Sequence, residues 1–156
     1  TMAFFSKSSN ASLPLALDCA KNRLGVSDKT ASFSLPLCSI INMNGCAAFI
    51  LITLFFVCSS QGIHFTVWEM IPWIFLSTLA AIGNAGVPMG CFFLTTAFLI
   101  GMGVPIELMG MILPLYSLFD MIETALNVWS DSFIKSIETK ANTAIREAMD
   151  NLRGDS

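Results

Sequence analysis

The sequence has few charged residues for its length. Only 12% of its 156 residues are Asp, Glu, Lys or Arg, whereas a typical soluble domain carries about 25%. Residues 31–63 and 70–106 contain none at all, and each stretch exceeds the roughly 20 apolar residues that cross the hydrocarbon core of a bilayer. The composition therefore argues against a soluble domain and predicts an all-α membrane protein.

Other absences argue against further classes of protein. The five cysteines have no CxxC spacing, so the sequence predicts neither a disulfide framework nor a metal site formed by cysteines. The basic residues do not gather into a patch and the net charge is −3, so we expect no nucleic-acid partner. No GxGD motif accompanies the acidic residues, which argues against an intramembrane aspartyl protease. We expect no catalytic residue and no enzyme activity.

Three polar interruptions divide the apolar segments, at residues 6–10, 42–45 and 83–88. Backbone polar groups left bare in lipid cost several kcal/mol each, so a broken helix is tolerated only beside protein or a wet cavity. Transporters place such breaks near the bilayer midplane, where helix ends bind anionic groups and cations. Three breaks in one short chain favour a binding site over the alternative, which is kinks packed inside protein.

The distribution of lysine and arginine predicts the orientation in the membrane. These residues flank the connection at 24–28 and follow the last helix, whereas the connections at 61–65 and 101–105 have none. Because cytoplasmic loops are rich in them, we expect the 24–28 loop and the C-terminus to be cytoplasmic. The predicted segments are the end of a hairpin (1–24), a broken transmembrane helix (28–60), a hairpin (66–103), a last helix (106–132) and a polar cytoplasmic tail (133–156). Charge alone leaves open whether the 66–103 hairpin dips halfway or spans twice.

A stripe of polar residues runs along the last helix. With about 100° between successive residues of a helix, its members share one face over about 16 Å. An acid at mid-membrane costs roughly 2.5–3.5 kcal/mol, so three acids on one face predict a cavity that binds cations or an ammonium group. The alternative is a helix end that emerges into water, which suits Asp131 better than Asp120. The stripe consists of Asp120, Glu123, Thr124, Asn127 and Asp131.

Four motifs, in order along the chain, resemble the dicarboxylate/amino acid:cation symporter family. SSNASLP (8–14) resembles the serine-rich tip of the first re-entrant hairpin, and NMNG (42–45) resembles the NMDGT motif of the seventh transmembrane helix. AIGNAGVP (81–88) resembles the tip of the second re-entrant hairpin, and DMIETALNVWSD (120–131) resembles the eighth helix. The resemblance covers nearly the whole chain and implies the C-terminal half of a sodium-coupled transport core, with part of the first hairpin.

The resemblance also implies which residues bind the substrate. Asp120 would hold the amino group, Asn127 and the hairpin tip at Ser8 and Ser9 would hold the carboxylate, and Val87 would close over both. The complete implied set is Ser8, Ser9, Cys46, Val87, Asp120, Glu123, Thr124 and Asn127.

Sodium ions are the co-substrates that the resemblance implies. One site would combine Asp131 with the carbonyls of Cys38, Asn42 and Asn127. A second would combine Met43 with the carbonyls of Ile40, Ala81, Ile82 and Asn84. Asn42 and Asn44 would belong to a third, whose other ligands lie in helices absent from this sequence. Asn44 replaces the aspartate of the family motif, so we expect fewer coupled sodium ions.

Two departures from the family pattern bear on the substrate. Members that carry acidic substrates have arginine in place of Glu123 and threonine in place of Cys46. At about 4 Å and an effective dielectric constant near 20, Glu123 would repel a substrate carboxylate by roughly 4 kcal/mol. Aspartate and glutamate are therefore expected to be poor substrates unless Glu123 is protonated. The run ETALN (123–127) resembles the bacterial serine/threonine branch, so we expect a small neutral amino acid; a cationic side chain facing Glu123 is the alternative.

The family resemblance implies an inner or plasma membrane location, a lipid environment and a homotrimer. The first six helices of the family's fold, including the trimer scaffold, are absent from this sequence. We therefore expect an N-terminal half elsewhere and no transport by these residues alone. Two alternatives stay open: a symporter for acidic amino acids or dicarboxylates, and a truncated fragment that does not transport.

Overall fold

The fold is described by a computed structural model for residues 2–22, 28–84 and 87–154. All secondary structure within these residues is helical, which confirms the predicted all-α class. The 24–28 connection and the tip residues Ala85 and Gly86 lie wholly or mainly outside the described residues. The helices are α1 (Met2–Ser6), α2 (Ser9–Asn22), α3 (Asp28–Ile41), α4 (Asn44–Ser60), α5 (Val67–Asn84), α6 (Gly90–Gly101) and α7 (Glu107–Gly154).

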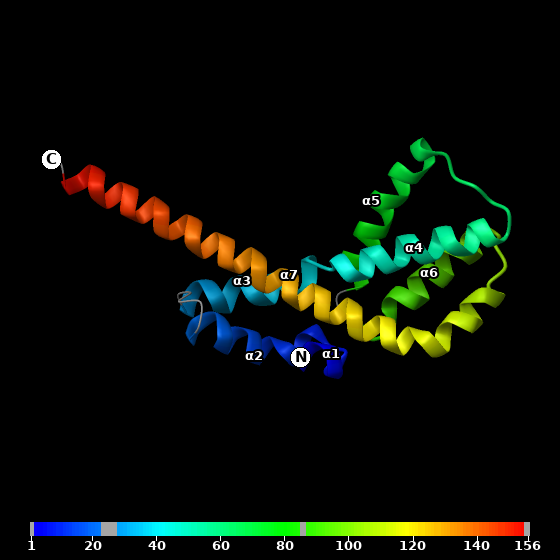
Figure 1. Ribbon diagram of the computed structural model, residues 1–156, viewed down its shortest axis with the longest axis horizontal. Helices are drawn as coiled ribbons and strands as arrows, with labels where there is room; N and C mark the ends of the chain where they lie inside the picture. The colour runs from blue at the N-terminus through cyan, green and yellow to red at the C-terminus, as the bar shows by residue number, and fades with distance from the viewer. Residues whose placement is uncertain (1, 23–27, 85–86, 155–156) are drawn as a thin grey trace.

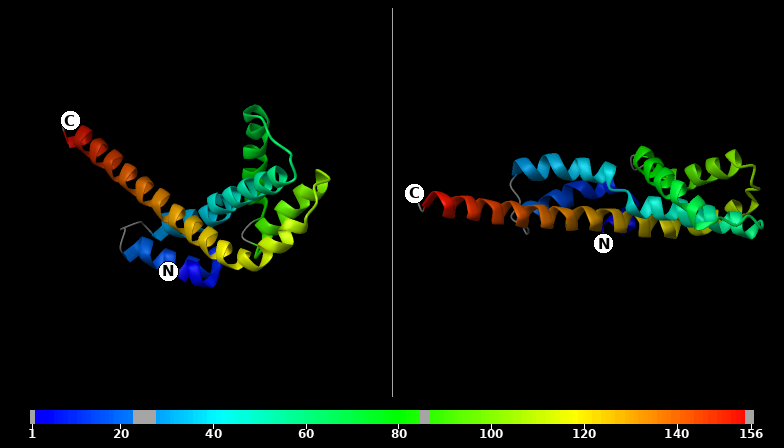
Figure 2. Two further views of the ribbon diagram at one scale, coloured as in Figure 1. Left: turned by 45° about the vertical axis from the view of Figure 1, so that its right-hand side comes forward. Right: turned by 90° about the horizontal axis from the view of Figure 1, so that it is seen from above.

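Helix α7 is the axis against which most other helices pack. Figure 1 shows α4 and α6 beside its N-terminal part, and α1, α2 and α3 further along, and all five contact it. The helix bends in the stretch that contains Pro114, where the ring removes one backbone hydrogen bond. Figure 2 shows α1–α3 gathered toward one half of the molecule and α4–α6 toward the other.

Helix α7 is also longer than the sequence predicts. It has 48 residues, which corresponds to about 72 Å, more than twice the roughly 30 Å hydrocarbon core of a bilayer. The helix does not stop near residue 132 but continues through the residues predicted as a polar tail. Neither proline nor glycine occurs between Leu115 and Arg153 to end it. The cytoplasmic location of this extension stays a prediction.

Two of the predicted interruptions separate short helices inside the fold. Between α1 and α2, Lys7 has φ +52°, and the Ser8 hydroxyl accepts a hydrogen bond from the Ala11 amide at 3.2 Å. That contact is a helix N-cap, and it explains why α2 begins at Ser9. Between α3 and α4, the helix breaks at Asn42 and Met43.

Helix α5 begins with a side-chain cap. The Thr66 amide donates a hydrogen bond to Oε2 of Glu69 at 2.7 Å, which is one half of a capping box. This bond favours the charged form, and it lowers the pKa of the exposed Glu69 carboxyl below its usual range. The cap fixes where the α5–α6 hairpin begins, since it satisfies an amide that the helix leaves unpaired.

The main hydrophobic core joins α4, α5, α6 and α7. Its centre is Tyr116 of α7, which is fully buried and lies between Phe49 of α4 (ring centroids 5.0 Å apart) and Phe92 of α6 (5.4 Å). Edge-on and tilted aromatic pairs of this kind stabilise a core beyond their buried area. The core therefore holds α6 against α4 and α7 immediately beside the polar stripe.

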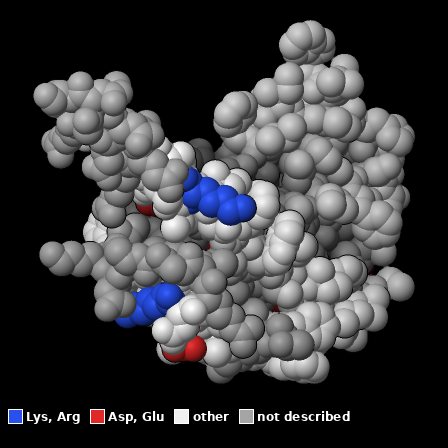
Figure 3. All heavy atoms as spheres, turned by 60° about the vertical axis from the view of Figure 1, so that its left-hand side comes forward, with Lys and Arg blue, Asp and Glu red and all other residues white. Residues whose placement is uncertain are grey.

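Among the described residues, two segments are long and apolar enough to cross a bilayer: Ala31–Ser60, which includes the break between α3 and α4, and Glu107–Ala144 of α7. Large apolar side chains are also exposed, among them Trp68 (79%) and Phe75 (69%) of α5. Figure 3 shows one face of the molecule; among the residues there that are not grey, most of the surface is white, that is, uncharged. Broad apolar exposure marks contact with lipid or with other protein. By contrast, α6 has only 12 residues, or about 18 Å, which is too short to cross.

Gly45 permits a close approach between α4 and α7. A Cβ atom at this position would lie 2.8 Å from both the Cα and the carbonyl oxygen of Glu123. Because those atoms are backbone, they cannot move aside without displacing α7. We predict that Gly45→Ala lowers the free energy of unfolding by about 1–3 kcal/mol, measured by denaturant titration in detergent.

The matched control is Gly110→Ala, since a Cβ on that glycine of α7 meets nothing within 4 Å. Alanine is the better helix former by up to about 1 kcal/mol, so this substitution should be neutral or stabilising. Equal stability of the two variants would contradict the close contact.

Candidate functional site

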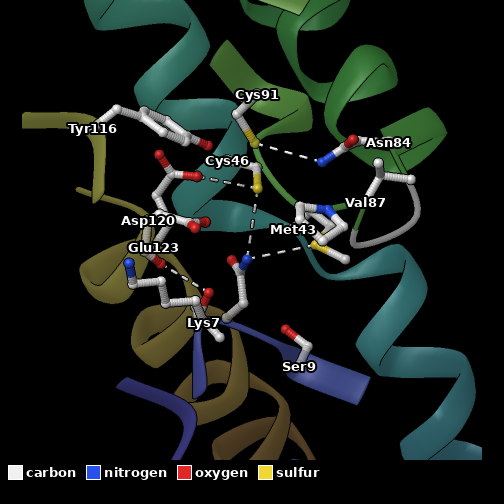
Figure 4. Close-up of a pocket in the computed structure, with 13 residues that line it drawn as sticks. Lys7, Ser9, Met43, Cys46, Asn84, Val87, Cys91, Tyr116, Asp120 and Glu123 are labelled. Atoms are coloured by element: carbon white, nitrogen blue, oxygen red, sulfur yellow. Dashed lines mark hydrogen bonds between the residues drawn. The ribbon is translucent and has the colours of Figure 1, made fainter. Parts of the chain in front are cut away.

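A pocket lies where the two helix breaks and the tip of the α5–α6 hairpin meet α7 (Figure 4). Lys7 and Ser9 reach it from the first break, Met43 from the second, and Val87 from the hairpin tip. The three interruptions predicted from the sequence thus converge on one point. Seven of the eight predicted substrate residues line this pocket: Ser9, Cys46, Val87, Asp120, Glu123, Thr124 and Asn127.

Ser8 is the predicted substrate residue that does not line the pocket. Its hydroxyl instead accepts the Ala11 amide at the start of α2. The two serines of the motif therefore have different roles. Ser8 caps α2, whereas Ser9, which is 8% exposed, borders the cavity.

Asn127 of α7 forms hydrogen bonds with the residues at the break between α3 and α4. Its Oδ1 accepts a hydrogen bond from the Gly45 amide at 2.8 Å, one of the amides left unpaired at the start of α4. Its Nδ2 donates to Sδ of Met43 at 3.5 Å and to Sγ of Cys46 at 3.8 Å. Asn127 is 3% exposed, so this one amide uses both its oxygen and its nitrogen to position three residues of the NMNGC segment.

Glu123 faces the same segment. Its Oε2 accepts a hydrogen bond from Sγ of Cys46 at 3.4 Å. Its Oε1 is buried and has no hydrogen-bond partner among the described residues. A buried acceptor without a donor costs about 1–3 kcal/mol, so Glu123 offers an oxygen that a bound ligand can satisfy.

The pocket is narrow in this conformation. Its cavity volume is about 20 Å³, which accommodates about one or two water molecules. Val87, 59% exposed, and Lys7 form part of its wall. The cavity in this conformation is therefore smaller than an amino acid.

Eight of the ten residues predicted to bind sodium lie at or next to the ends of α3, α4 and α5, whereas Asn127 and Asp131 lie in the middle of α7. Nδ2 of Asn42 donates to Oδ1 of the buried Asp131 at 2.9 Å, and Nδ2 of Asn44 donates to Oγ of Ser130 at 2.9 Å. Met43 and Asn84 line the pocket. Apart from Asn127, the remaining predicted residues occupy the last turns of α3 and α5, the helix ends that carry partial negative charge; they are Cys38, whose carbonyl accepts a hydrogen bond from the Asn42 amide at 2.8 Å, and Ile40, Ala81 and Ile82.

Comparison with known proteins identifies the family. Residues 1–140 match the model of the sodium:dicarboxylate symporter family. The chain belongs to this family. The description of this symporter family names sodium as the transported cation, in agreement with the resemblance seen in the motifs.

Relatives in the symporter family carry two kinds of name. An excitatory amino acid transporter of Caenorhabditis elegans is 30% identical over 96% of this chain and 30% of its own length. Mouse excitatory amino acid transporter 3 is 30% identical over 95% of this chain and 28% of its own length. Mouse neutral amino acid transporter B(0) is 30% identical over 84% of this chain and 24% of its own length. The chain spans about a third or less of these relatives, and their names do not choose between acidic and neutral substrates.

Four residues that line the pocket are missing from the prediction: Lys7, Pro88, Cys91 and Tyr116. Lys7 directly precedes the SSNASLP motif and Pro88 is the last residue of AIGNAGVP, so both positions carry a sequence signal. Cys91 and Tyr116 lie in apolar runs whose pattern fits core packing equally well. Their position in the pocket follows from the packing of α6 on α7, which the sequence pattern does not specify.

We predict that Asn127→Ala destabilises the fold by about 1–3 kcal/mol, because it leaves the buried Gly45 amide without an acceptor. Asn44→Ala is the matched control, since it also removes an asparagine bond between α4 and α7, but at an exposed position. Its effect should stay within about 0.5 kcal/mol. Denaturant titration in sodium-free buffer measures both, and equal losses would contradict the role of Asn127.

Proposed function

We propose that this chain contributes the substrate site of a sodium-coupled symporter for a small neutral amino acid with a side-chain hydroxyl, such as serine or threonine. The observation that carries the proposal is Glu123, a buried carboxylate of the pocket whose Oε1 lacks a donor among the described residues. A substrate hydroxyl supplies such a donor.

In its ionised form, Glu123 also disfavours an acidic side chain. Two carboxylates at about 4 Å repel each other by roughly 4 kcal/mol at an effective dielectric constant near 20, close to a thousandfold in affinity. A substrate without the hydroxyl leaves Oε1 unpaired, and that loss is worth about 1–3 kcal/mol. The expected order of preference is therefore serine and threonine above alanine, and alanine above aspartate.

The remaining lining residues suit the backbone of an amino acid. Asp120 in α7 carries the charge that an ammonium group needs, and Ser9 offers a hydroxyl to a carboxylate. Nδ2 of Asn127 would bind the carboxylate by giving up its contacts to the sulfur atoms of Met43 and Cys46. Lys7 lies in the same pocket and adds a positive charge on the side of α1. We place no chemical step in this site and propose transport rather than catalysis.

A specific observation favours a second candidate, an acidic amino acid. Lys7 lines the pocket, and its ammonium group can pair with a side-chain carboxylate in place of the arginine that acidic-substrate members carry. Two of the three relatives described above are named excitatory amino acid transporters. Uptake measurements separate the two candidates.

We further propose a topology for the segment. Because α6 is about 18 Å long, the α5–α6 pair would enter the membrane and return to the same side, with Val87 beside the site. The C-terminal part of α7 would be cytoplasmic in the inner or plasma membrane. A complete transporter would add N-terminal helices and, as in the family, form a homotrimer.

The substrate proposal predicts sodium-dependent uptake of serine above aspartate by proteoliposomes that hold a full-length protein containing this chain. Glu123→Gln should keep serine uptake, because the amide oxygen still accepts a hydroxyl, and should raise aspartate uptake by removing the repulsion. Glu123→Arg should reverse the preference.

Glu69→Gln is the matched control for charge, since this glutamate caps α5 outside the pocket and should leave the preference unchanged. Aspartate uptake above serine uptake in the unaltered protein would defeat the neutral-substrate proposal and favour the second candidate.

The sodium proposal makes a separate prediction. Asp131→Asn removes the one full charge from a predicted sodium site while preserving the shape of the side chain. Half-maximal uptake should then require about tenfold to a hundredfold more sodium, because an interaction with one charged group contributes about 1.5–3 kcal/mol to binding. An unchanged sodium dependence of uptake would exclude Asp131 as a ligand.

A further inference from the structure

Two cysteines and a glutamate from three helices meet beside the pocket. Cys46 of α4, Cys91 of α6 and Glu123 of α7 each offer one ligand atom, and these atoms lie within 4.8 Å of one another. The side chains are 6%, 2% and 5% exposed, and Figure 4 shows the two sulfur atoms side by side with the carboxylate pointing toward Cys46. We propose that these residues form a binding site for a thiophilic divalent cation of the Zn²⁺ class.

The donor set fits such an ion in kind and number. Thiolate sulfur with carboxylate oxygen is a common donor combination for Zn²⁺, and three protein ligands leave the fourth tetrahedral position to water. With metal–sulfur bonds of about 2.3 Å, the sulfurs of a tetrahedral site lie roughly 3.8 Å apart. The observed separation limit of 4.8 Å requires only a small inward shift of α6.

A second observation points to a ligand at this place. Oε1 of Glu123 is buried without a hydrogen-bond partner among the described residues, while Oε2 contacts Cys46. A cation would satisfy the unpaired oxygen. The site lies beside the pocket, so water can supply the fourth ligand.

The packing of α6 orients the second cysteine. Nδ2 of Asn84 donates to Sγ of Cys91 at 3.6 Å. Asn84 occupies the space that a side chain on Gly90 would fill, because a Cβ there would lie 1.6 Å from its Oδ1. Asn84 therefore orients Cys91 by a hydrogen bond, as residues in the outer shell of a metal site orient the metal ligands.

Binding has a defined proton balance and a structural consequence. The thiols of Cys46 and Cys91 bind as thiolates, so two protons leave to the buffer for each ion bound. The ion would join α4, α6 and α7 and so fasten the α5–α6 hairpin over the pocket. Metal binding does not depend on the proposed transport; if that proposal holds, the ion competes with the amino acid for Glu123.

The test is a Cd²⁺ titration of the full 156-residue chain in detergent, with a phosphine reductant that keeps the cysteines as thiols. The ultraviolet thiolate-to-cadmium charge-transfer band reports binding, and a pH indicator counts the released protons. We expect a single ion per chain, two thiol protons released, displacement of Cd²⁺ by Zn²⁺, and no displacement by Mg²⁺ or Na⁺, which prefer oxygen ligands.

Variants assign the ligands. Cys46→Ala and Cys91→Ala should each abolish stoichiometric binding, while Glu123→Gln should keep the band and weaken affinity about tenfold to a hundredfold. Cys58→Ala is the control, because Cys58 is equally buried in α4 but is not part of the cluster, and it should bind as the unaltered chain does. Circular dichroism checks that each variant is folded.

The proposal is overturned if the unaltered chain binds no Cd²⁺, if Cys91→Ala binds as tightly as the unaltered chain, or if Cys58→Ala loses binding equally. Should the cysteine variants fail to fold, the unaltered chain and Glu123→Gln still decide the outcome. Serine uptake does not enter the readout, so failure of the metal site and failure of the transport proposal are distinguishable.

Discussion

The contact between the start of α4 and the middle of α7 determines the arrangement of the site. The absence of a side chain at Gly45 lets the backbones approach, and Asn127 accepts the amide that this helix start exposes. From that contact follow the position of Cys46 beside Glu123 and the bond from Asn42 to Asp131. A bulkier residue at position 45 would separate both pairs at once.

The helix breaks give a membrane-embedded chain its polar chemistry. An unbroken helix uses its own amides and carbonyls, and leaves nothing for a ligand. Each break frees a few of them, and the stripe on α7 supplies side chains opposite. In this molecule the free amide of Gly45 is taken by Asn127, while Oε1 of Glu123 has no such partner. The unsatisfied group is the one that distinguishes substrates in our proposal.

Much of this arrangement could be predicted from the sequence, for physical reasons. The charge-free stretches set the helical membrane class, and the periodicity of α7 placed Glu123, Thr124 and Asn127 on one face, as the pocket requires. Cys91 could not be found in this way, because its place depends on how α6 packs on α4. Helix α7 is longer than predicted, because the polarity after residue 132 predicts the end of a helix although no proline or glycine there breaks it before Gly154. The roles of the sodium ligands stay predictions.

The most direct test of the account is protection of Cys46 from alkylation, followed by mass spectrometry of the reconstituted full-length protein. Cys46 borders the pocket and contacts Glu123, so a substrate bound there must shield it. The account predicts that serine slows modification of Cys46 only when sodium is present, and that aspartate has little effect. Protection by aspartate as strong as that by serine, or no protection by either, would contradict it.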